Sequence, residues 1–192
     1  GSARRELEFY RGIDSASGRN LVALGDRDLA THILRQQLLT TGASLSEVTR
    51  TLCQRLGVQH ELVPMTDDPV ATIVQTRTGE ALAFQHYFVR DRCVPEVVGF
   101  EFQGIEAALP SPGFMAGLQD PDLSAIVICP SNPFVSVDPV LALPGILTAM
   151  RASKAPVIAV SPIVGGLAIK GPAAKMMAEL GMPQSALAVA KH

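Results

Sequence analysis

Residues 124–181 read SAIVICPSNPFVSVDPVLALPGILTAMRASKAPVIAVSPIVGGLAIKGPAAKMMAELG and predict a strand, a helix, a second strand and a second helix in succession. Two runs in this stretch, Ala125–Cys129 and Ala155–Val160, are continuously apolar and have the length of a strand. Because neither run alternates apolar and polar residues, we expect both strands to be covered on both faces, as in a parallel sheet.

The segment between the two strands carries the signals of a broken helix. Asp138 is a good N-cap, and Pro139 follows at the first helical position. Pro144 prevents one straight helix, so we expect a single turn and then a helix from Pro144 to about Ala152. A strand–helix–strand unit of this kind is a right-handed crossover that leaves its two strands parallel.

Small polar residues and glycines follow the two strands. Ser131 and Asn132, held between two prolines, come after the first strand, and Gly165 and Gly166 come after the second. Because parallel strands end at the same edge of a sheet, we expect the two loops to open into one crevice, where open α/β sheets bind ligands. Hydroxyl and amide groups, and glycine N–H groups that a ligand can approach closely, suit this role.

Lys170 adds a cation to the predicted crevice. It precedes Gly171-Pro172, and we expect a helix over Pro172–Leu180 that Gly181 closes. A cation beside a helix N-terminus is unfavourable for stability and suits an anion such as phosphate. The spacing matches neither a Walker A loop nor a G-x-G-x-x-G fingerprint, so it predicts a polyanion-binding crevice. The alternative is that Gly165-Gly166 forms a plain turn.

An amphipathic helix with a charged N-terminal end is predicted from Asp28 to about Thr40. Asp26 either caps this helix or takes part in a site. Arg27 is unfavourable at a helix N-terminus and suits an anionic or planar ligand. His32 lies one turn after Asp28, which leaves open a structural or a catalytic His–Asp pair.

A helical hairpin and a β-meander are predicted to lie between this helix and the main strands. A capping box at Ser44 and Glu47 opens a second helix, which Gly57 closes. Three strands are expected after it, over Ala71–Thr76, Ala81–Val89 and Glu96–Phe102.

Two adjacent carboxylates, Asp67 and Asp68, form the other acidic candidate site. They can hold Mg²⁺ through water while a phosphate supplies further ligands, which makes them the candidate catalytic and metal residues. The run Thr66-Asp67-Asp68-Pro69 is equally typical of a turn, because Asp before Pro commonly initiates one. Both interpretations stay open.

The composition excludes several classes of protein. The 192 residues carry 16 basic and 18 acidic side chains, so there is no electrostatic signal for nucleic acid or an anionic membrane. Prolines interrupt the longest apolar run, and no signal peptide is visible. The three cysteines form no C-x-x-C pair, which disfavours a disulfide framework or a zinc site. We expect a folded cytoplasmic protein.

Four blocks of sequence carry a family resemblance. They are GDRDLATHILR (Gly25–Arg35), PMTDDPVATIVQT (Pro64–Thr76), PSNPFVSVDPVLALPGI (Pro130–Ile146) and SPIVGGLAIKGPAAKMMAELG (Ser161–Gly181). Together they resemble the 2-phospho-L-lactate transferase family of deazaflavin coenzyme F(420) biosynthesis, over roughly Leu24 to the C-terminus.

The resemblance implies a reaction. A phospholactyl or phosphoenolpyruvyl group passes from a guanosine diphosphate-linked donor to the terminal ribityl hydroxyl of the deazaflavin precursor Fo, with release of GMP and assistance from Mg²⁺. The resemblance places Arg27, with Asp26 and His32 of the same helix, on the deazaflavin side. The residues on the nucleotide and diphosphate side are then Ser131, Asn132, Gly165, Gly166 and Lys170. We also expect a homodimer.

The sequence departs from the family pattern in two respects. Cys129 stands where glycine is expected before Pro-Ser-Asn-Pro, and a thiol there narrows the approach to the phosphates. Relatives begin with a glycine-rich phosphate loop and an Asn-Thr-Gly-Asp-type acidic motif, and neither is present. We therefore expect the chain to be a fragment, and the opening Gly1-Ser2 is typical of a tag scar.

The predicted fold class is α/β, a three-layer Rossmann-like parallel sheet with an inserted helical hairpin and β-meander lobe. We expect residues 1–20 to be a tag scar and linker or edge segment, 21–122 the helical and meander lobe, and 123–192 the Rossmann-like βαβα core. The alternatives to a transferase are a nucleotide-binding regulatory protein resembling the gluconeogenesis factors, or an inactive fragment of the transferase.

Overall fold

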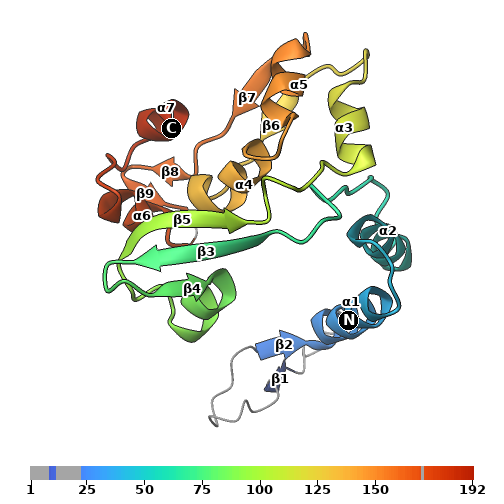
Figure 1. Cartoon of the computed structure of the whole chain (residues 1–192), viewed down its shortest axis with the longest axis horizontal. Coiled ribbons are helices and arrows are strands. Elements are labelled where there is room, and N and C mark those ends of the chain that lie inside the picture. The colour runs from blue at the N-terminus through green and yellow to red at the C-terminus, as the bar shows by residue number, and fades with distance from the viewer. Residues whose placement is uncertain (1–8, 12–22, 170) are drawn as a thin grey trace, which may run out of the picture. The chain divides into compact units, whose positions relative to one another are not determined.

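The computed structural model of the chain describes residues 9–11, 23–169 and 171–192, and only the backbone of residues 9–11 and 23–27 (Figure 1). By its internal contacts the chain divides into two compact units, Gly1–Pro64 and Met65–His192. Both units combine helices with strands, and the second contains parallel and antiparallel pairs, so the predicted α/β class is confirmed. The division into three segments at residues 20 and 122 stays a prediction.

The described residues of the first unit form two short strands and two helices: β1 (Phe9–Arg11), β2 (Ala23–Gly25), α1 (Asp26–Thr40) and α2 (Leu45–Leu56). The two strands pair antiparallel, with Phe9 opposite Gly25. Because α1 begins at Asp26, earlier than the expected start at Asp28, Asp26 belongs to the helix and does not precede it.

The turn between α1 and α2 confirms the predicted capping box. The Ser44 hydroxyl accepts a hydrogen bond from the Glu47 N–H at 3.2 Å, and the Glu47 carboxylate accepts one from the Ser44 N–H at 2.8 Å. Gly57 ends α2 at a φ of +71°, a left-handed conformation that glycine adopts without steric cost. The predicted helical hairpin is therefore present in full.

The second unit begins with an antiparallel sheet of three strands, β3 (Ala71–Thr76), β4 (Ala81–Ala83) and β5 (Val97–Gln103), in the order β4-β3-β5. Val74 on the central strand lies opposite Leu82 on β4 and Phe100 on β5. The predicted hairpin and its third strand are confirmed.

The predicted strand Ala81–Val89 is wrong after its first three residues. A π-helical turn, η1 (His86–Arg90), follows β4. Phe84 and Phe88 stack with their ring centroids 5.4 Å apart. Tyr87, which precedes Phe88 in the chain, is fully buried. A spacing of four residues suits one helical turn as well as a strand, so the aromatic pattern alone did not decide between them.

The remaining elements of the second unit lead through the main strands to the C-terminus. They are α3 (Pro112–Leu118), β6 (Ile126–Ile128), η2 (Pro133–Val137), α4 (Asp138–Leu141), α5 (Ile146–Ala152), β7 (Val157–Ala159), β8 (Ile163–Val164), β9 (Leu167–Ala168), α6 (Ala173–Glu179) and α7 (Ala186–Lys191).

The strands β6 and β7 form the predicted parallel pair. Ile126 lies opposite Val157, and the Val160 N–H donates to the Ile128 carbonyl at 3.0 Å. Figure 1 shows the two strands side by side, with α5 of the connecting segment next to them. The strand–helix–strand unit is therefore confirmed, with strands shorter than expected.

The expectation that both faces of this pair are covered is wrong within the part of the chain that the structure describes. Ile126 packs toward α5, but Val127 on β6 is 56% exposed and Ile158 on β7 is 50% exposed. These two side chains share the face opposite Ile126, because neighbouring residues of a strand point to opposite faces. Val157, which shares the face of Ile126, is also 48% exposed, so the helix covers that face at β6 and leaves β7 exposed on both faces.

The connecting helix starts earlier than predicted. Asn132, not Asp138, is the N-cap, and η2 runs directly into α4. The predicted break at Pro144 is confirmed, since α5 begins only after Gly145, whose φ is +88°. Both Asn132 and Asp138 precede a proline, so the same start signal occurs twice and the first one operates.

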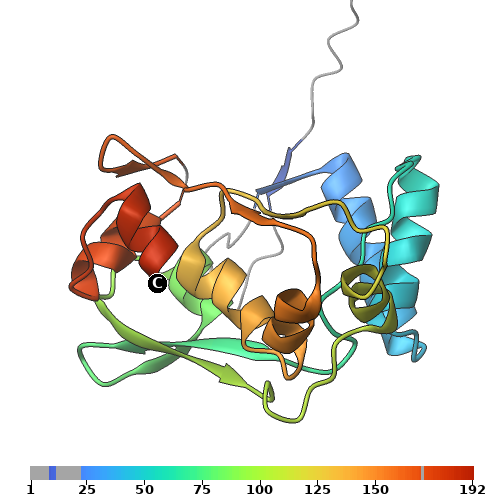
Figure 2. The same ribbon diagram turned by 90° about the horizontal axis from the view of Figure 1, so that it is seen from above.

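Two clusters of buried side chains hold the second unit together. The first, which we call the meander cluster, joins the three-stranded sheet to the C-terminal segments through Val74, Tyr87, Val97, Phe134, Ile163, Ala173, Met176 and Met177. The second, the α5 cluster, comprises Ala108, Leu118, Leu143 and Ile146. Figure 2 shows α4 and α5 (orange) and α6 and α7 (red) on the same side of β3 and β5 (green).

No single helix among the described residues is long and apolar enough to cross a membrane. The segments Pro133–Leu141 and Ile146–Ala152 meet the length and composition criteria only when taken together, and they are bent by 76° at the break.

Candidate functional site

The loop after β6 holds its two predicted site residues in different ways. The side-chain Oδ1 of Asn132 accepts hydrogen bonds from the backbone N–H groups of Phe134 (3.0 Å) and Val135 (3.4 Å). Asn132 therefore uses its carbonyl oxygen to cap η2. Ser131, immediately before it, is half-buried at the end of the loop.

The segment after β7 is a tight hairpin and not an open loop. β8 and β9 pair antiparallel, with Ile163 opposite Ala168, around the two-residue turn Gly165-Gly166. Both glycines have positive φ, +58° and +80°, the conformation that favours glycine at both positions of such a turn. A Cβ at Gly165 would meet nothing within 4 Å. The turn conformation thus explains these glycines, and Gly165 is exposed.

The loop after β6 and the hairpin after β7 pack on one cluster of side chains. Phe134, close after Asn132, lies in the meander cluster with Ile163 of β8, and Ala168 of β9 packs against it. The Asn132 side-chain Nδ2 also donates to the Met176 sulfur of α6 at 3.2 Å. The structure therefore brings the segments of Ser131-Asn132 and Gly165-Gly166 to the same part of the second unit.

The cation predicted for this crevice, Lys170, lies outside the described residues. The helix expected after it is confirmed with a slightly later start, since α6 runs over Ala173–Glu179 with Pro172 in front of it. Gly181 follows at a φ of +71°, as expected for the residue that closes the helix.

The Asp67-Asp68 run forms a turn in the structure. The Thr66 hydroxyl donates to the Leu109 carbonyl at 2.6 Å and accepts from the Asp68 N–H at 3.0 Å. The Leu109 N–H in turn donates to Asp68 Oδ2 at 2.8 Å. Both carboxylates are exposed. The flanking Met65 and Val70 pack on the α5 cluster, whereas Asn132 bonds to Met176 of the meander cluster and Ile163 of the hairpin belongs to that cluster.

Carboxylate oxygens are suitable Mg²⁺ ligands, but Asp67 and Asp68 do not form a complete cage. Among the described residues, no group of three or more His, Cys, Asp or Glu side chains is placed to hold a metal ion. Mg²⁺ commonly keeps several waters and binds through one or two carboxylates together with substrate phosphates. The two exposed carboxylates fit that mode.

The residues predicted for the deazaflavin side belong to the first unit. His32 is exposed on α1, and the structure shows no ion pair between His32 and Asp28 within the described residues. The side chains of Asp26 and Arg27 lie outside the described part of the chain. Their predicted roles stay predictions.

A polar cluster that sequence reasoning missed fixes α6 to the three-stranded sheet. Lys175 donates to the Pro95 carbonyl at 3.1 Å and forms an ion pair with Glu179, which accepts from the Val97 N–H at 3.1 Å. The Lys175 ammonium also lies 5.9 Å from the centroid of the Tyr87 ring. The only signal in the sequence is the four-residue spacing of Lys175 and Glu179. Their partners lie about 80 residues away and leave no local trace.

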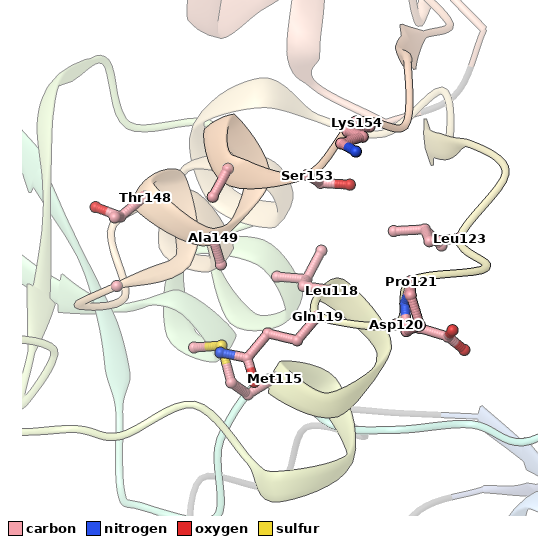
Figure 3. A pocket seen from close by; sticks show the side chains of 12 residues that line it. Met115, Leu118, Gln119, Asp120, Pro121, Leu123, Thr148, Ala149, Ser153 and Lys154 are labelled. Atoms are coloured by element: carbon pink, nitrogen blue, oxygen red, sulfur yellow. The ribbon is translucent and has the colours of Figure 1, made fainter.

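A cavity of about 700 Å³ lies between α3 and α5 (Figure 3). Its apolar lining includes Met115, Leu118 and Leu123, and Ser153 and Lys154 lie at its polar side. These residues precede β6 and β7 in the chain, so the cavity lies at the amino ends of the parallel strands. None of the predicted site residues lines it, and the predicted crevice belongs to the carboxyl ends of the same strands.

Comparisons with known proteins agree with the residues that suggested the family. The family model described as 2-phospho-L-lactate transferase CofD matches residues 3–191. A phosphoenolpyruvate transferase from Kitasatospora aureofaciens is 42% identical over 192 residues, which cover 98% of this chain and 58% of the relative. A 2-phospho-L-lactate transferase from Halobacterium salinarum is also 42% identical, over 98% of this chain and 54% of the relative.

A solved structure supports the fold. The crystal structure of a protein from Bacillus halodurans superposes with a TM-score of 0.55 at 16% sequence identity, over 77% of this chain and 44% of that protein. The likeness at this identity concerns the fold alone. The chain spans little more than half the length of the curated relatives it matches. On the match over residues 3–191, the chain belongs to the 2-phospho-L-lactate transferase family.

Proposed function

We propose that this chain contributes to a transferase that moves a phospholactyl or phosphoenolpyruvyl group from a guanosine diphosphate-linked donor to the deazaflavin precursor Fo. The observation that carries the proposal is the parallel pairing of β6 and β7 in a chain of this family. Because the two strands are parallel, the Ser131 loop and the Gly165 hairpin both follow the carboxyl ends of neighbouring strands, where α/β sheets bind ligands.

The reaction requires positioning and charge neutralisation more than a protein nucleophile. The terminal hydroxyl oxygen of Fo forms a bond to the phosphorus that carries the lactyl or enolpyruvyl group. The bond from that phosphorus to the GMP oxygen breaks, GMP leaves, and the hydroxyl proton passes to a base. Reactions of this class are accelerated chiefly by groups that orient the phosphates and balance their charge.

The proposed nucleotide site consists of Ser131, Asn132, Gly165, Gly166 and Lys170. Ser131 contributes a hydroxyl, and the glycine turn offers backbone N–H groups that an oxygen of a diphosphate can approach. The position of Ser131 and Gly165 on segments that share the meander cluster supports this assignment.

Asp67 and Asp68 are the residues that we propose to hold Mg²⁺, with a substrate phosphate and waters as the other ligands. Bound there, the ion would neutralise phosphate charge. Asp68 already accepts from the Leu109 N–H, which fixes its orientation. Asp67 is exposed next to it and is the candidate base for the hydroxyl proton.

Arg27 is the residue that we propose to contact the deazaflavin, together with Asp26 and His32 of α1. A planar guanidinium can stack on a planar ring system or bind an anionic group. Replacing Arg27 with Ala is expected to weaken Fo binding at least about tenfold and to leave GDP binding nearly unchanged. Calorimetric titration with each ligand measures this. An equal loss of both affinities would contradict a site with two separate sides.

Transfer itself is tested by incubating the chain with a labelled lactyl or enolpyruvyl diphosphoguanosine donor, Fo and Mg²⁺. The Kitasatospora aureofaciens relative serves as the positive control. Label in the deazaflavin product supports a transferase, and the preferred donor shows whether the transferred phosphoryl group carries lactate or enolpyruvate. Nucleotide binding without any transfer would instead favour the regulatory alternative or an inactive fragment of the transferase. We also propose a cytoplasmic homodimer, which sedimentation analysis with and without GDP would test.

A further inference from the structure

The side-chain amide of Asn132 is engaged at both ends. Its Oδ1 accepts from the N–H groups of Phe134 and Val135, and its Nδ2 donates to the Met176 sulfur at 3.2 Å. Each of these partners belongs to the chain itself. The oxygen and one of the two Nδ2 hydrogens are therefore used within the chain, which leaves a single N–H of this amide for other contacts.

The orientation of this amide is fixed by its partners. Two backbone N–H donors can be met only by the carbonyl oxygen of the side chain, so exchanging the oxygen and nitrogen positions would set the NH₂ group against them. Nδ2 must therefore face Met176. The thioether sulfur is a weak acceptor, and it is the group that Asn132 meets there.

The two bonded residues belong to segments that follow different strands. Asn132 lies directly after β6, whereas Met176 lies on α6, which follows β7 and the β8–β9 hairpin. Met176 is fully buried in the meander cluster, which also contains Ile163 of β8. A contact from Asn132 to Met176 thus connects the loop after one parallel strand to the packed segment after the other.

We infer that Asn132 is a positioning residue, which sets the distance between Ser131 and the Gly165-Gly166 turn through its bond to Met176. This inference rests on the proposed function, since it assigns direct contact with a nucleotide diphosphate to Ser131 and to the glycine N–H groups. Asn132 shapes that site without touching the ligand through its side chain. The competing explanation is that Asn132 only caps η2, so that its side chain affects the stability of this helical turn and not the position of the hairpin.

Two substitutions separate the positioning role from the cap. Asn132→Asp keeps an oxygen for the N–H groups of η2, and Asp caps helices about as well as Asn. It removes the Nδ2 donor and sets a carboxylate oxygen toward the sulfur. Met176→Leu keeps an apolar side chain of similar volume and removes the acceptor. The matched control is Ser136→Ala, on the exposed side of the same helical turn.

The first measurement is hydrogen exchange of the unliganded chain followed by mass spectrometry of its peptides. Positioning predicts that Asn132→Asp and Met176→Leu each speed exchange severalfold in residues 163–169 as well as in 131–137. The double variant should exchange about as fast as either single variant, because both substitutions remove one shared bond. Ser136→Ala should leave residues 163–169 unchanged.

The second measurement is the dissociation constant for GDP. Loss of one hydrogen bond predicts about a fivefold weaker affinity in Met176→Leu, and a larger loss in Asn132→Asp because its carboxylate also repels the diphosphate. The double variant should bind about as weakly as Asn132→Asp alone. Unchanged exchange in residues 163–169 overturns the inference, whatever the affinities are. Faster exchange there in a chain whose wild type does not bind GDP supports the structural link and counts against the proposed function instead.

Discussion

The antiparallel sheet β3–β5 and the parallel pair β6–β7 are built from similar apolar residues and differ in what covers them. Val74 and Val97 of the antiparallel sheet are fully buried, because the helices and hairpin of the meander cluster pack on one face. Val127 and Ile158 of the parallel pair are at least half exposed. An apolar run therefore predicts that a strand forms, and it does not provide the layer that covers the strand.

The two regions also bury their apolar surface by different routes. An antiparallel sheet can leave one face in water, and β3 does so with alternating exposed and buried residues along its C-terminal half. Parallel sheets usually have helices on both faces. In the described part of this chain Ile126 of β6 packs toward α5, whereas Val127 and all three residues of β7 are exposed, which is unusual for a parallel pair.

The largest expected effect comes from placing the same charge in the two regions. Val74→Asp buries a carboxylate among apolar side chains and should lower the free energy of unfolding by at least about 3 kcal/mol, or prevent folding. Val127→Asp, on the open face, should lower it by about 1 kcal/mol or less, which reflects the poor strand propensity of Asp. Urea unfolding followed by circular dichroism measures both.

A large loss of stability in Val127→Asp would contradict the difference in exposure between the two regions. It would mean that the face of Val127 is covered in solution, for example by self-association. Sedimentation of the wild type at several concentrations would identify that case, because the covering would then depend on protein concentration.

An intermediate effect is expected at two glycines with positive φ, one after each region. Gly104 follows β5 at a φ of +85°, and a Cβ there would lie 2.5 Å from the Pro69 carbonyl oxygen. Gly165 follows β8 at +58° with open space around it. Gly104→Ala should cost at least about 2 kcal/mol, and Gly165→Ala about 1 kcal/mol from conformation alone.

Thermal or urea unfolding of the two alanine variants gives the measurement. Equal losses would show that the Pro69 backbone moves aside readily, and that the antiparallel region is less rigid than its burial implies. The substitution at Gly165 also provides a variant in which turn strain changes without any change in the buried cores.

Local signals in the sequence predicted the elements that depend on a few neighbouring residues. The capping box at Ser44 and Glu47 and the parallel crossover between β6 and β7 were confirmed because each follows from short-range chemistry. The start of the connecting helix was wrong because Asn132 and Asp138 carry the same Asx-Pro signal. Which of them operates depends on tertiary packing, in this case Phe134 entering the meander cluster.

Features that depend on distant segments could not be predicted. Whether another element packs on the face of Val127 depends on distant segments, and the residues of β6 and β7 do not specify which element that is. The contact from Asn132 to Met176 joins residues 44 positions apart, and the bond from Lys175 to Pro95 joins residues 80 positions apart. The residue types of the candidate site were visible in the sequence. The structural roles, Asn132 as a helix cap and Gly165-Gly166 as a hairpin turn, became clear only from their hydrogen-bond and strand partners.

The smallest expected effect at neutral pH concerns the buried hydroxyl of the antiparallel region. Tyr87 is fully buried, and its hydroxyl lies 3.5 Å from the Cys93 carbonyl, a long contact. Tyr87→Phe should therefore change the free energy of unfolding by less than about 1 kcal/mol near pH 7. No comparable ionisable group is buried in the parallel strands β6 and β7.

At alkaline pH the same substitution should reverse its sign. Burial raises the pKa of the Tyr87 hydroxyl well above its ordinary value of 10.0, and the negative charges of Cys93 and Glu179 act in the same direction. The unfolded chain releases this proton near pH 10 and the folded chain does not, so the stability that the neutral hydroxyl provides is present below pH 10 and is lost as the pH rises further. Tyr87→Phe has no such proton, and above pH 10 it should become more stable than the wild type.

Urea unfolding of both proteins across this pH range tests the crossover. Both proteins should carry Tyr10→Phe, so that tyrosinate absorbance reports Tyr87 alone. Ionisation of Tyr87 near pH 10 in the folded protein would show that the antiparallel region opens to water as readily as the parallel pair.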